Sequence, residues 1–169
     1  MVELKSERLN TLKNNFEGKK IAVIGDMMID GYFWGDVKRV SPEAPVPILE
    51  VEEEFFRFGG AANVALNITK LGGTAIPIGV IGYDNYGTIF TSLMKDSNLE
   101  DSGIFVDDER PTTTKTRVIA NNQHVVRIDK ESKEYLNAVL EAKISSYISS
   151  RINGIDGIIL QDYNKIKIS

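Results

Sequence analysis

Two glycines and an asparagine form the clearest ligand-binding pattern in this sequence. Gly59 and Gly60 stand directly before a helical stretch, within "FGGAANVALNITKLGG" at residues 58 to 73, and Asn63 follows one turn later. Glycine lets a ligand approach the backbone closely, and the first N–H groups of a helix point outward toward such a ligand. The Asn63 amide offers both a donor and an acceptor, which suits a sugar hydroxyl. The alternative is a tight strand-to-helix turn that binds nothing, because glycine pairs are common.

Two carboxylates come just after a short apolar run. "KKIAVIGD", residues 19 to 26, is typical of a strand buried on both faces, and Asp26 and Asp30 follow at its carboxyl end. Open α/β sheets bind their ligands at that end of the strands, where a carboxylate can hold two hydroxyls of a sugar. Capping of a turn or helix is the alternative role for each carboxylate.

Three cations lie in a β-rich segment. "TTTKTRVIANNQHVVRID", residues 112 to 129, predicts a hairpin that turns at its two asparagines and carries Lys115, Arg117 and Arg127. Arginine is well shaped for phosphate, so these cations could grip an anionic substrate. A two-residue loop places the arginines on opposite faces, whereas a three-residue loop that includes Gln123 places them on one face. The alternative is that the charges simply keep an edge strand soluble.

Composition excludes several classes of function. The chain of 169 residues is 42% hydrophobic and 26% charged, which suits one main domain with a sizeable core. A net charge of -4 without a basic run argues against nucleic acid as a partner. Without cysteine, and with one histidine, we expect neither a disulfide nor a His/Cys metal site. No apolar run approaches the roughly 20 residues that span a bilayer and no signal-peptide core is present, so we expect a cytoplasmic protein.

The elements that must position these residues alternate between strands and helices. An amphipathic helix is predicted over residues 3 to 15, and a second helix should bury Val64, Ile68 and Leu71 and end at a left-handed Gly72. The later elements are, in order, a strand over 74 to 82, a helix with the stripe Ile89, Phe90, Leu93 and Met94, a strand over 103 to 107, a helix with the stripe Leu136, Leu140, Ile144 and Ile148, and a strand over 156 to 162. This alternation predicts an α/β layer with a largely parallel sheet.

Two segments interrupt the alternation. Residues from about 31 to 55 contain three prolines and two strand-like stretches, and residues from about 112 to 129 form the hairpin described above. We expect both to build a small antiparallel flap, a lid that projects from the edge of the main layer over a crevice. Within these segments we expect His124 to be exposed beside the turn, the acidic run that begins at Glu50 to be a solvated strand edge, and the aromatic residues around Trp34 to form a subunit contact.

The order of these pieces is more specific than any one of them. The chain reads "VIGDMMIDGYFWGDVKRVSPEAPVPILEV", then "GGAANVALNITKLGG", "IGVIGYDNYG", "RPTTTKTRVIANNQHVVRID" and "LQDYNK". This order resembles the ribokinase-like (PfkB-type) sugar kinases, and among them the D-glycero-β-D-manno-heptose 7-phosphate kinases of lipopolysaccharide core synthesis. "SPEAPVP" and the stretch from "TKTR" to "RID" favour that subfamily over ribokinase and adenosine kinase, and the resemblance runs from about Lys19 to Lys165.

The resemblance implies a Rossmann-like α/β domain with a β lid that closes over the sugar and, in many members, forms the contact of a homodimer. It also implies a sugar-phosphate substrate and the cofactors ATP and Mg²⁺. Carried over by motif, the sugar contacts would be Asp30, Gly59, Gly60 and Asn63, and the lid side of the site, within reach of the substrate phosphate, would hold Lys115, Arg117, Gln123 and Arg127. Asp162, within "DYNK", would lie near the floor of the crevice.

The chain also departs from that family. Its members carry a later Gly-Ala-Gly-Asp segment, whose N–H groups hold the transferring phosphate and whose Asp is the general base. This sequence ends at "DYNKIKIS" without such a segment, and Ile166 stands where the family has glycine. We therefore expect the fold to stop before the nucleotide-binding half, with an uncovered sheet edge, no catalytic residue and no ATP turnover by this chain alone.

Three interpretations remain open at this point. The chain can be part of an ATP-dependent heptose 7-phosphate kinase, a non-catalytic module that binds a sugar phosphate or dimerises, or a truncated product without a stable fold. The first is the interpretation that we prefer as a statement of family.

Overall fold

The structure of this chain is a computed structural model, and it describes residues 6–162. Within this range two four-stranded sheets have the strand orders β5-β4-β1-β8 and β3-β2-β6-β7. The elements are, in chain order, α1 (Ser6–Phe16), β1 (Lys20–Gly25), β2 (Met27–Val40), β3 (Pro47–Gly59), α2 (Gly60–Lys70), β4 (Thr74–Gly82), α3 (Asn85–Asp96), β5 (Ile104–Asp107), β6 (Thr113–Ala120), β7 (Gln123–Lys130), α4 (Ala138–Arg151), the 3-10 turn η1 (Ile152–Gly154) and β8 (Gly157–Gln161).

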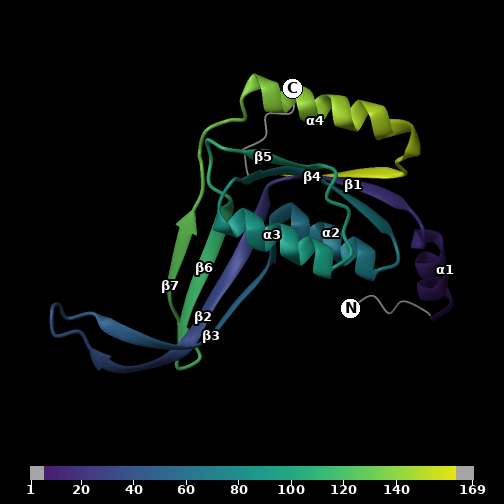
Figure 1. The fold of residues 1–169 in the computed structure, drawn as a ribbon. Coiled ribbons are helices and arrows are strands. Elements are labelled where there is room, and N and C mark those ends of the chain that lie inside the picture. The colour runs from purple at the N-terminus through teal and green to yellow at the C-terminus, as the bar shows by residue number, and fades with distance from the viewer. Residues whose placement is uncertain (1–5, 163–169) are drawn as a thin grey trace.

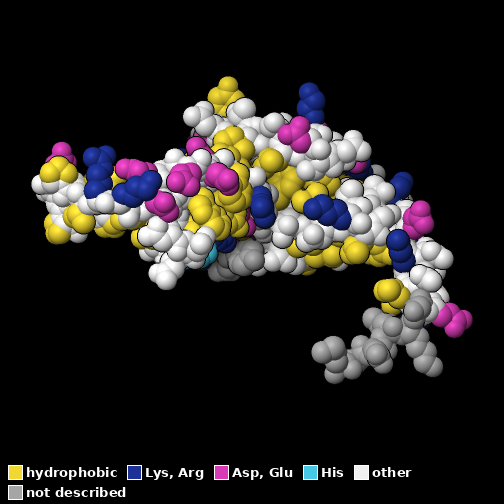
Figure 2. Space-filling model, turned by 90° about the horizontal axis from the view of Figure 1, so that it is seen from below, with side chains coloured by type: hydrophobic (Ala, Val, Ile, Leu, Met, Phe, Trp, Pro, Cys, Tyr) yellow, Lys and Arg dark blue, Asp and Glu magenta, His cyan; other side chains and the backbone are white. Residues whose placement is uncertain are grey.

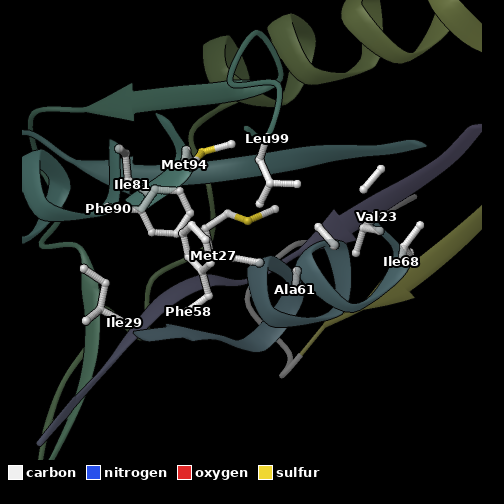
Figure 3. Close-up of a cluster of buried hydrophobic side chains, with 13 residues drawn as sticks. Val23, Met27, Ile29, Phe58, Ala61, Ile68, Ile81, Phe90, Met94 and Leu99 are labelled. Atoms are coloured by element: carbon white, nitrogen blue, oxygen red, sulfur yellow. The ribbon is translucent and has the colours of Figure 1, made fainter. Parts of the chain in front are cut away.

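The first sheet is parallel and lies between helices, as the sequence predicted. Each pairing in it, β1 with β4, β1 with β8 and β4 with β5, is parallel. Figure 1 shows α4 across one face and α2 and α3 across the other. Side chains alternate along β1, so Val23 joins the core with α2 and α3 (Figure 3), whereas Ile24 joins a second core with α4. The predicted α/β layer is therefore confirmed.

The buried face of α2 differs in part from the predicted stripe. Ile68 is buried and Val64 is half-buried, but Leu71 is 62% exposed because α2 ends at Lys70. The rest of the buried face consists of Ala61, Ala62 and Ala65. These small side chains allow the helix to sit close to the sheet, a role that a search for large apolar residues overlooks. Gly72 has φ +95°, as predicted for a residue that follows a helix end.

Two other helix predictions need adjustment at their starts. α1 begins at Ser6 among the described residues, and positions 3 to 5 of its predicted range lie outside them. α4 begins at Ala138, because the Asn137 side chain accepts a hydrogen bond from the Leu140 N–H at 3.0 Å and caps the helix there. Leu136 is buried as predicted, but it precedes the helix.

The second sheet, which we call the lid, is mixed and not antiparallel as predicted. β2 pairs with β3 and β6 with β7 in antiparallel fashion, but the central pair, β2 with β6, is parallel. β2 follows β1 and β6 follows β5, and β1 and β5 run in the same direction in the first sheet, so both lid strands leave its carboxyl edge in one direction. The lid strands at 27–40 and 47–59 extend beyond the predicted segment of about 31 to 55.

The hairpin from β6 to β7 combines a two-residue loop with a bulge. Asn121 and Asn122 have φ of 49° and 63°, the left-handed values of the predicted tight turn. The pairing then shifts, because Ile119 pairs with His124 while its neighbour Val118 pairs with Val126. Val125 is thus an extra residue on β7. From Val126 onward, each β7 residue therefore pairs one position later than it would in a hairpin without the bulge.

Asp84 fastens the lid to the start of α3. Its carboxylate accepts hydrogen bonds from the Gly87 N–H at 2.8 Å, the Thr112 hydroxyl at 2.7 Å and the Thr112 N–H at 3.1 Å. Lys130, at the end of β7, adds an ion pair at 3.8 Å. Burial raises the pKa of Asp84, but the hydrogen bonds from Thr112 and Gly87 and the charge of Lys130 outweigh it, so the pKa is lowered.

The edge strand β8 is largely uncovered. It pairs with β1 on one side, and among residues 6–162 no strand pairs with its other side. Ile158 is 45% exposed and Leu160 is 58% exposed, although a strand in a parallel sheet normally buries such residues. No helix within the described part of the chain is both long enough and apolar enough to cross a membrane.

Candidate functional site

The turn between β3 and α2 requires glycine at both positions. Gly60 has φ +52°, and a Cβ there would lie 2.4 Å from the Asp26 carbonyl oxygen. That oxygen already accepts a hydrogen bond from the Ala61 N–H at 3.0 Å. A Cβ at Gly59 would lie 2.8 Å from the Met28 side chain and 3.1 Å from Asp30 Oδ2. The absence of side chains at the glycine pair therefore lets the turn pack closely. It also leaves open the space next to the Asp30 carboxylate.

Asp30 lies on β2 and is already engaged by the lid. Arg117, on the adjacent strand β6, donates a hydrogen bond from Nη1 to Asp30 Oδ1 at 2.6 Å. Both side chains keep about a fifth of their surface exposed, 22% for Asp30 and 23% for Arg117. The guanidinium also lies 5.3 Å from the centre of the Tyr32 ring. Asp30 is thus an anionic acceptor that a polar ligand can reach.

Asp30 and Asn63 border one open depression of about 480 Å³. Its lining comes from β2, β3, α2 and α3, and consists of Asp30, Tyr32, Phe56, Arg57, Phe58, Asn63, Leu66, Lys70, Leu93 and Ser97. This volume lies within the range of about 300 to 1,000 Å³ that is usual for small-molecule sites. Aromatic walls with a few carboxylate, amide and cationic groups form a lining that suits a polar, hydroxylated ligand.

The lid cations lie on the same face of the lid as Asp30. The bulge in β7 places Arg117 opposite Arg127, so both lie on one face although the loop has two residues. Neither of the two loop predictions foresaw this combination. Lys115 pairs with Asp129 at 3.2 Å, and Arg127 pairs with the same carboxylate at 2.8 Å. The hydrogen bond from Arg127 and the contact with Lys115 lower the pKa of Asp129, and the bond to Asp129 raises the pKa of Arg127.

Gln123 does not join these residues. It is the first residue of β7 and pairs with Ala120, whereas Asp129 pairs with Lys115 near Asp30. Asp129 lies six positions after Gln123 along the strand, a distance of roughly 20 Å at about 3.3 Å per residue. His124 is exposed beside the turn, as predicted.

Asp162 lies at the carboxyl end of β8, beside the end of β1. Gly25 pairs with Gln161, and the Asp26 N–H donates a hydrogen bond to the Gln161 carbonyl at 3.1 Å. Asp162 is exposed there, at the same sheet edge from which the lid leaves. The rest of the "DYNK" motif lies outside the described residues.

Sequence reasoning missed three residues that border the depression, namely Tyr32, Arg57 and Lys70. Arg57 pairs with Asp30 across β2 and β3, so the two residues share a face of the lid. The sequence did contain a signal, because Arg57 stands directly before the "FGG" of the turn. The two residues are nevertheless 27 positions apart in the sequence, and local periodicity does not reveal that their strands pair in this register.

A larger depression, of about 680 Å³, lies between β5 and α4. Its walls include Phe105, Val139 and Tyr147, with Lys143 as the one ionisable side chain besides tyrosine. A site for a polar ligand needs several converging polar groups, which this surface lacks. The smaller depression at Asp30 is therefore the better candidate.

The resemblance implies ATP and Mg²⁺ as cofactors, which require ligands for the metal ion and a cradle for the phosphates. Residues 6–162 contain no group of three or more His, Cys, Asp or Glu side chains that could hold a metal ion. The sequence has no Gly-Ala-Gly-Asp segment and no G-x-x-x-x-G-K-[ST] loop that would cradle the phosphates. The groups present at the depression fit a hydroxylated anion better than a metal-bound nucleotide.

The sequence is similar to that of known carbohydrate kinases. The sequence profile described as "pfkB family carbohydrate kinase" matches residues 18–167. "Bifunctional protein HldE" of Helicobacter pylori (strain J99) is 51% identical over 147 residues, which are 87% of this chain and 32% of that protein. This chain thus spans about a third of the length of the curated relatives that it matches.

Two solved structures share the fold. A carbohydrate kinase from Agrobacterium tumefaciens aligns with a TM-score of 0.62 at 19% identity, over 84% of this chain and 45% of that one. Ribokinase from Cryptococcus neoformans var. grubii serotype A, solved in complex with ADP, aligns with a TM-score of 0.59 at 17% identity, over 89% of this chain and 42% of that one.

Proposed function

Because the chain belongs to the pfkB family of carbohydrate kinases, we propose that it forms the sugar-phosphate-binding part of an ATP-dependent kinase. The substrate that we propose is D-glycero-β-D-manno-heptose 7-phosphate, phosphorylated on its anomeric hydroxyl in ADP-heptose and lipopolysaccharide core synthesis. Similarity to HldE over 87% of the chain supports this choice within the family. The observation that carries the proposal is the meeting of Asp30 and Asn63 in one depression beside the glycine turn.

In this proposal the sugar hydroxyls bind to Asp30 and Asn63. A carboxylate oxygen accepts a hydrogen bond from a hydroxyl, and the Asn63 amide can donate or accept one. Gly59 and Gly60 keep side chains away, so that the sugar can approach the backbone of the turn. Charge-assisted hydrogen bonds to Asp30 replace the bond that Arg117 now makes to it, so binding exchanges one partner for another.

The lid cations contribute to recognition of the anionic substrate. Lys115, Arg117 and Arg127 lie on the face of the lid that carries Asp30, and they raise the electrostatic potential there. Gln123 lies too far along the lid to reach a substrate held at Asp30 unless the lid moves, so we assign it to the closed state of the lid. Asp162 lines the sheet edge below the lid, as the floor of the crevice.

ATP and Mg²⁺ are the cofactors that the family implies, and they supply the transferred phosphoryl group and its neutralising charge. Phosphoryl transfer depends on positioning and on charge stabilisation around the transferring group. We propose that this chain supplies the substrate half of that arrangement, has no catalytic residue, and does not turn over ATP by itself. We further propose that it acts in the cytoplasm, where ATP is available.

A homodimer through the lid is part of the proposal. Val126 and Ile128 lie on the lid face opposite to Arg127 and are 50% and 53% exposed. Figure 2 shows hydrophobic side chains interleaved with charges along the projecting β2–β3 arm. Exposed apolar side chains on a projecting sheet are candidates for a subunit contact. Val126→Lys should convert the dimer to a monomer in sedimentation velocity, and a wild-type chain that is monomeric at all concentrations would contradict the contact.

A non-catalytic sugar-phosphate-binding or dimerising module is the second candidate function. It is favoured by the same site, because binding of a sugar phosphate needs only the groups that border the depression. Thermal unfolding tests whether the chain binds the sugar phosphate, and ADP release tests whether it turns over ATP. We expect heptose 7-phosphate to raise the melting temperature of the purified chain, with no ADP formed in the presence of ATP and Mg²⁺. Sugar-phosphate-dependent ADP release by the pure chain would contradict the claim that it is inactive alone.

A further inference from the structure

Arg57 is held in place by two aromatic rings beside the sugar site. It pairs with Asp30 across the β2–β3 ladder, and its neighbours on the same face are Tyr32 and Phe55. These two rings stack with centroids 4.8 Å apart at an angle of 11°. The Arg57 guanidinium carbon lies 5.0 Å from the Phe55 centroid and 5.8 Å from that of Tyr32. Cation–π contact orients the guanidinium but leaves its N–H donors available.

Arg57 differs from the other cations of this lid face in its partners. Arg117, Lys115 and Arg127 each pair with a carboxylate, at 2.6, 3.2 and 2.8 Å respectively. Within residues 6–162 Arg57 makes no ion pair, and the same holds for Lys70, which borders the same depression. An anion bound by Arg57 therefore displaces no carboxylate, whereas an anion bound by the other three cations has to compete with one.

The depression runs along one face of α2. Asn63, Leu66 and Lys70 line it at spacings of three and four residues, so they share one face of α2. At a rise of about 1.5 Å per residue, the seven steps from Asn63 to Lys70 cover roughly 10 Å. Asp30 and Asn63 offer hydroxyl partners, and Arg57 lies across the ladder from Asp30. Lys70 adds positive charge about two helical turns further along α2.

We propose that Arg57 is the residue that binds the phosphate of the bound sugar phosphate, with Lys70 as a second positive charge. The planar guanidinium donates two parallel hydrogen bonds to phosphate oxygens from its position on the Tyr32–Phe55 stack. The identity of the sugar rests on the proposed function, but the anion site at Arg57 does not. This assignment makes Arg57 a specificity-determining residue for phosphorylated over unphosphorylated sugars.

The test follows the Arg Nε–H signals of the isotope-labelled chain by NMR while inorganic phosphate is added. We expect a saturable shift of the Arg57 signal in the wild-type chain. The variants lack that signal, so backbone amide signals of the residues that border the depression report their affinity, which we expect to be at least fivefold weaker in Arg57→Gln and to show an intermediate loss in Arg57→Lys, which keeps the charge without the planar fork. Arg39→Gln is the matched control, since Arg39 is an exposed cation of the β2–β3 arm away from the depression. Saturable shifts confined to Arg117 or Arg127, or the absence of any saturable shift at Arg57, would overturn the proposal.

A second titration separates this proposal from the proposed function. It uses heptose 7-phosphate and the unphosphorylated heptose with wild-type chain and Arg57→Gln. We expect the variant to lose affinity for the phosphate ester and to bind the free sugar as wild type does. If heptose 7-phosphate binds no better than inorganic phosphate, the proposed substrate fails and the anion site stands. If heptose 7-phosphate binds tightly and Arg57→Gln changes nothing, the proposed function stands and Arg57 is not the phosphate ligand.

Discussion

The Asp30 carboxylate lies beside two groups that are distant from it in the sequence. It accepts a hydrogen bond from Arg117, 87 positions later, and its other oxygen lies against the space that Gly59 keeps clear. A sugar that binds at Asp30 must replace the guanidinium bond with hydroxyl bonds. Both side chains of the ion pair keep about a fifth of their surface exposed, so a polar ligand can reach the carboxylate.

Asp30→Asn should weaken binding of heptose 7-phosphate by about tenfold to a hundredfold. The change removes charge-assisted hydrogen bonds, each worth about 1.5 to 3 kcal/mol, and tenfold in affinity corresponds to about 1.4 kcal/mol. Isothermal titration measures the effect, with Asp36→Asn as the control on the same strand, where the carboxylate lies in the projecting arm. Equal affinity of Asp30→Asn and wild type would remove Asp30 from the site.

Gly60→Ala should destabilise the fold by about 2 kcal/mol. The residue has φ +52°, and a Cβ would lie 2.4 Å from the Asp26 carbonyl oxygen, so backbone strain and overlap act together. Urea unfolding gives the free energy of unfolding for both proteins. Gly154→Ala is the control, since a Cβ there meets no atom within 4 Å, and its stability should match wild type within about 0.5 kcal/mol. A Gly60→Ala chain as stable as wild type would show that the turn can relax.

Among the elements, those marked by a local sequence pattern were the predictable ones. Continuous apolar runs identified β1 and β4, and the asparagine pair identified the β6–β7 turn. The parallel pairing of β2 with β6 and the bulge at Val125 depend on contacts that no local pattern encodes. The alanine face of α2 was missed because small residues carry little hydrophobic signal. At the site, Asp30, Asn63 and the glycines were predicted, whereas Arg57 required the β2–β3 register.

Asp84→Asn should loosen the junction between α3 and the lid. The carboxylate caps α3 at Gly87 and holds Thr112 through two hydrogen bonds, so we expect a loss of about 1 kcal/mol in the free energy of unfolding near pH 7. The folded pKa of Asp84 is lowered from its ordinary value of 3.8. The stabilisation is therefore fully present above about pH 3.8 and is lost as the pH falls through the lower folded value.

Urea unfolding from pH 7 to pH 2 measures this dependence. The difference between wild type and Asp84→Asn should shrink below about pH 3.8, the ordinary value of the carboxyl group. Asp108→Asn is the control, because Asp108 is an exposed aspartate close to the same junction, and its difference from wild type should stay near zero throughout. A constant difference for Asp84→Asn at all pH values would mean that its charge does not fasten the lid.

On the scale of the whole molecule, the fold class and the family predicted from the sequence are confirmed. The chain covers about a third of the HldE relative, and within residues 6–162 β8 has a paired strand on one side only. An exposed apolar strand at a sheet edge is a template for pairing with another chain. The depression at Asp30 and the β8 edge lie on different parts of the molecule. Substitutions at one can therefore change ligand binding without changing self-association of the chain, and the reverse.

Leu160→Lys should reduce irregular self-association at high protein concentration. Leu160 is 58% exposed on β8, and a charge on such an edge opposes pairing of strands between chains. Sedimentation velocity over a concentration series gives the fraction of large species. Leu9→Lys makes the same change on α1, where leucine is 55% exposed, and should leave that fraction as in wild type. Equal association of Leu160→Lys and wild type would exclude β8 as the contact.

The central proposal is that this chain binds a sugar phosphate as the substrate part of a sugar kinase and does not bind ATP and Mg²⁺ by itself. The most direct test is isothermal titration of the chain, shown to be folded by circular dichroism, with D-glycero-D-manno-heptose 7-phosphate and separately with ATP and Mg²⁺. We predict saturable binding of one sugar phosphate per chain and no binding of the nucleotide. Folded protein that fails to bind the sugar phosphate, or that binds ATP and Mg²⁺ on its own, would contradict this claim.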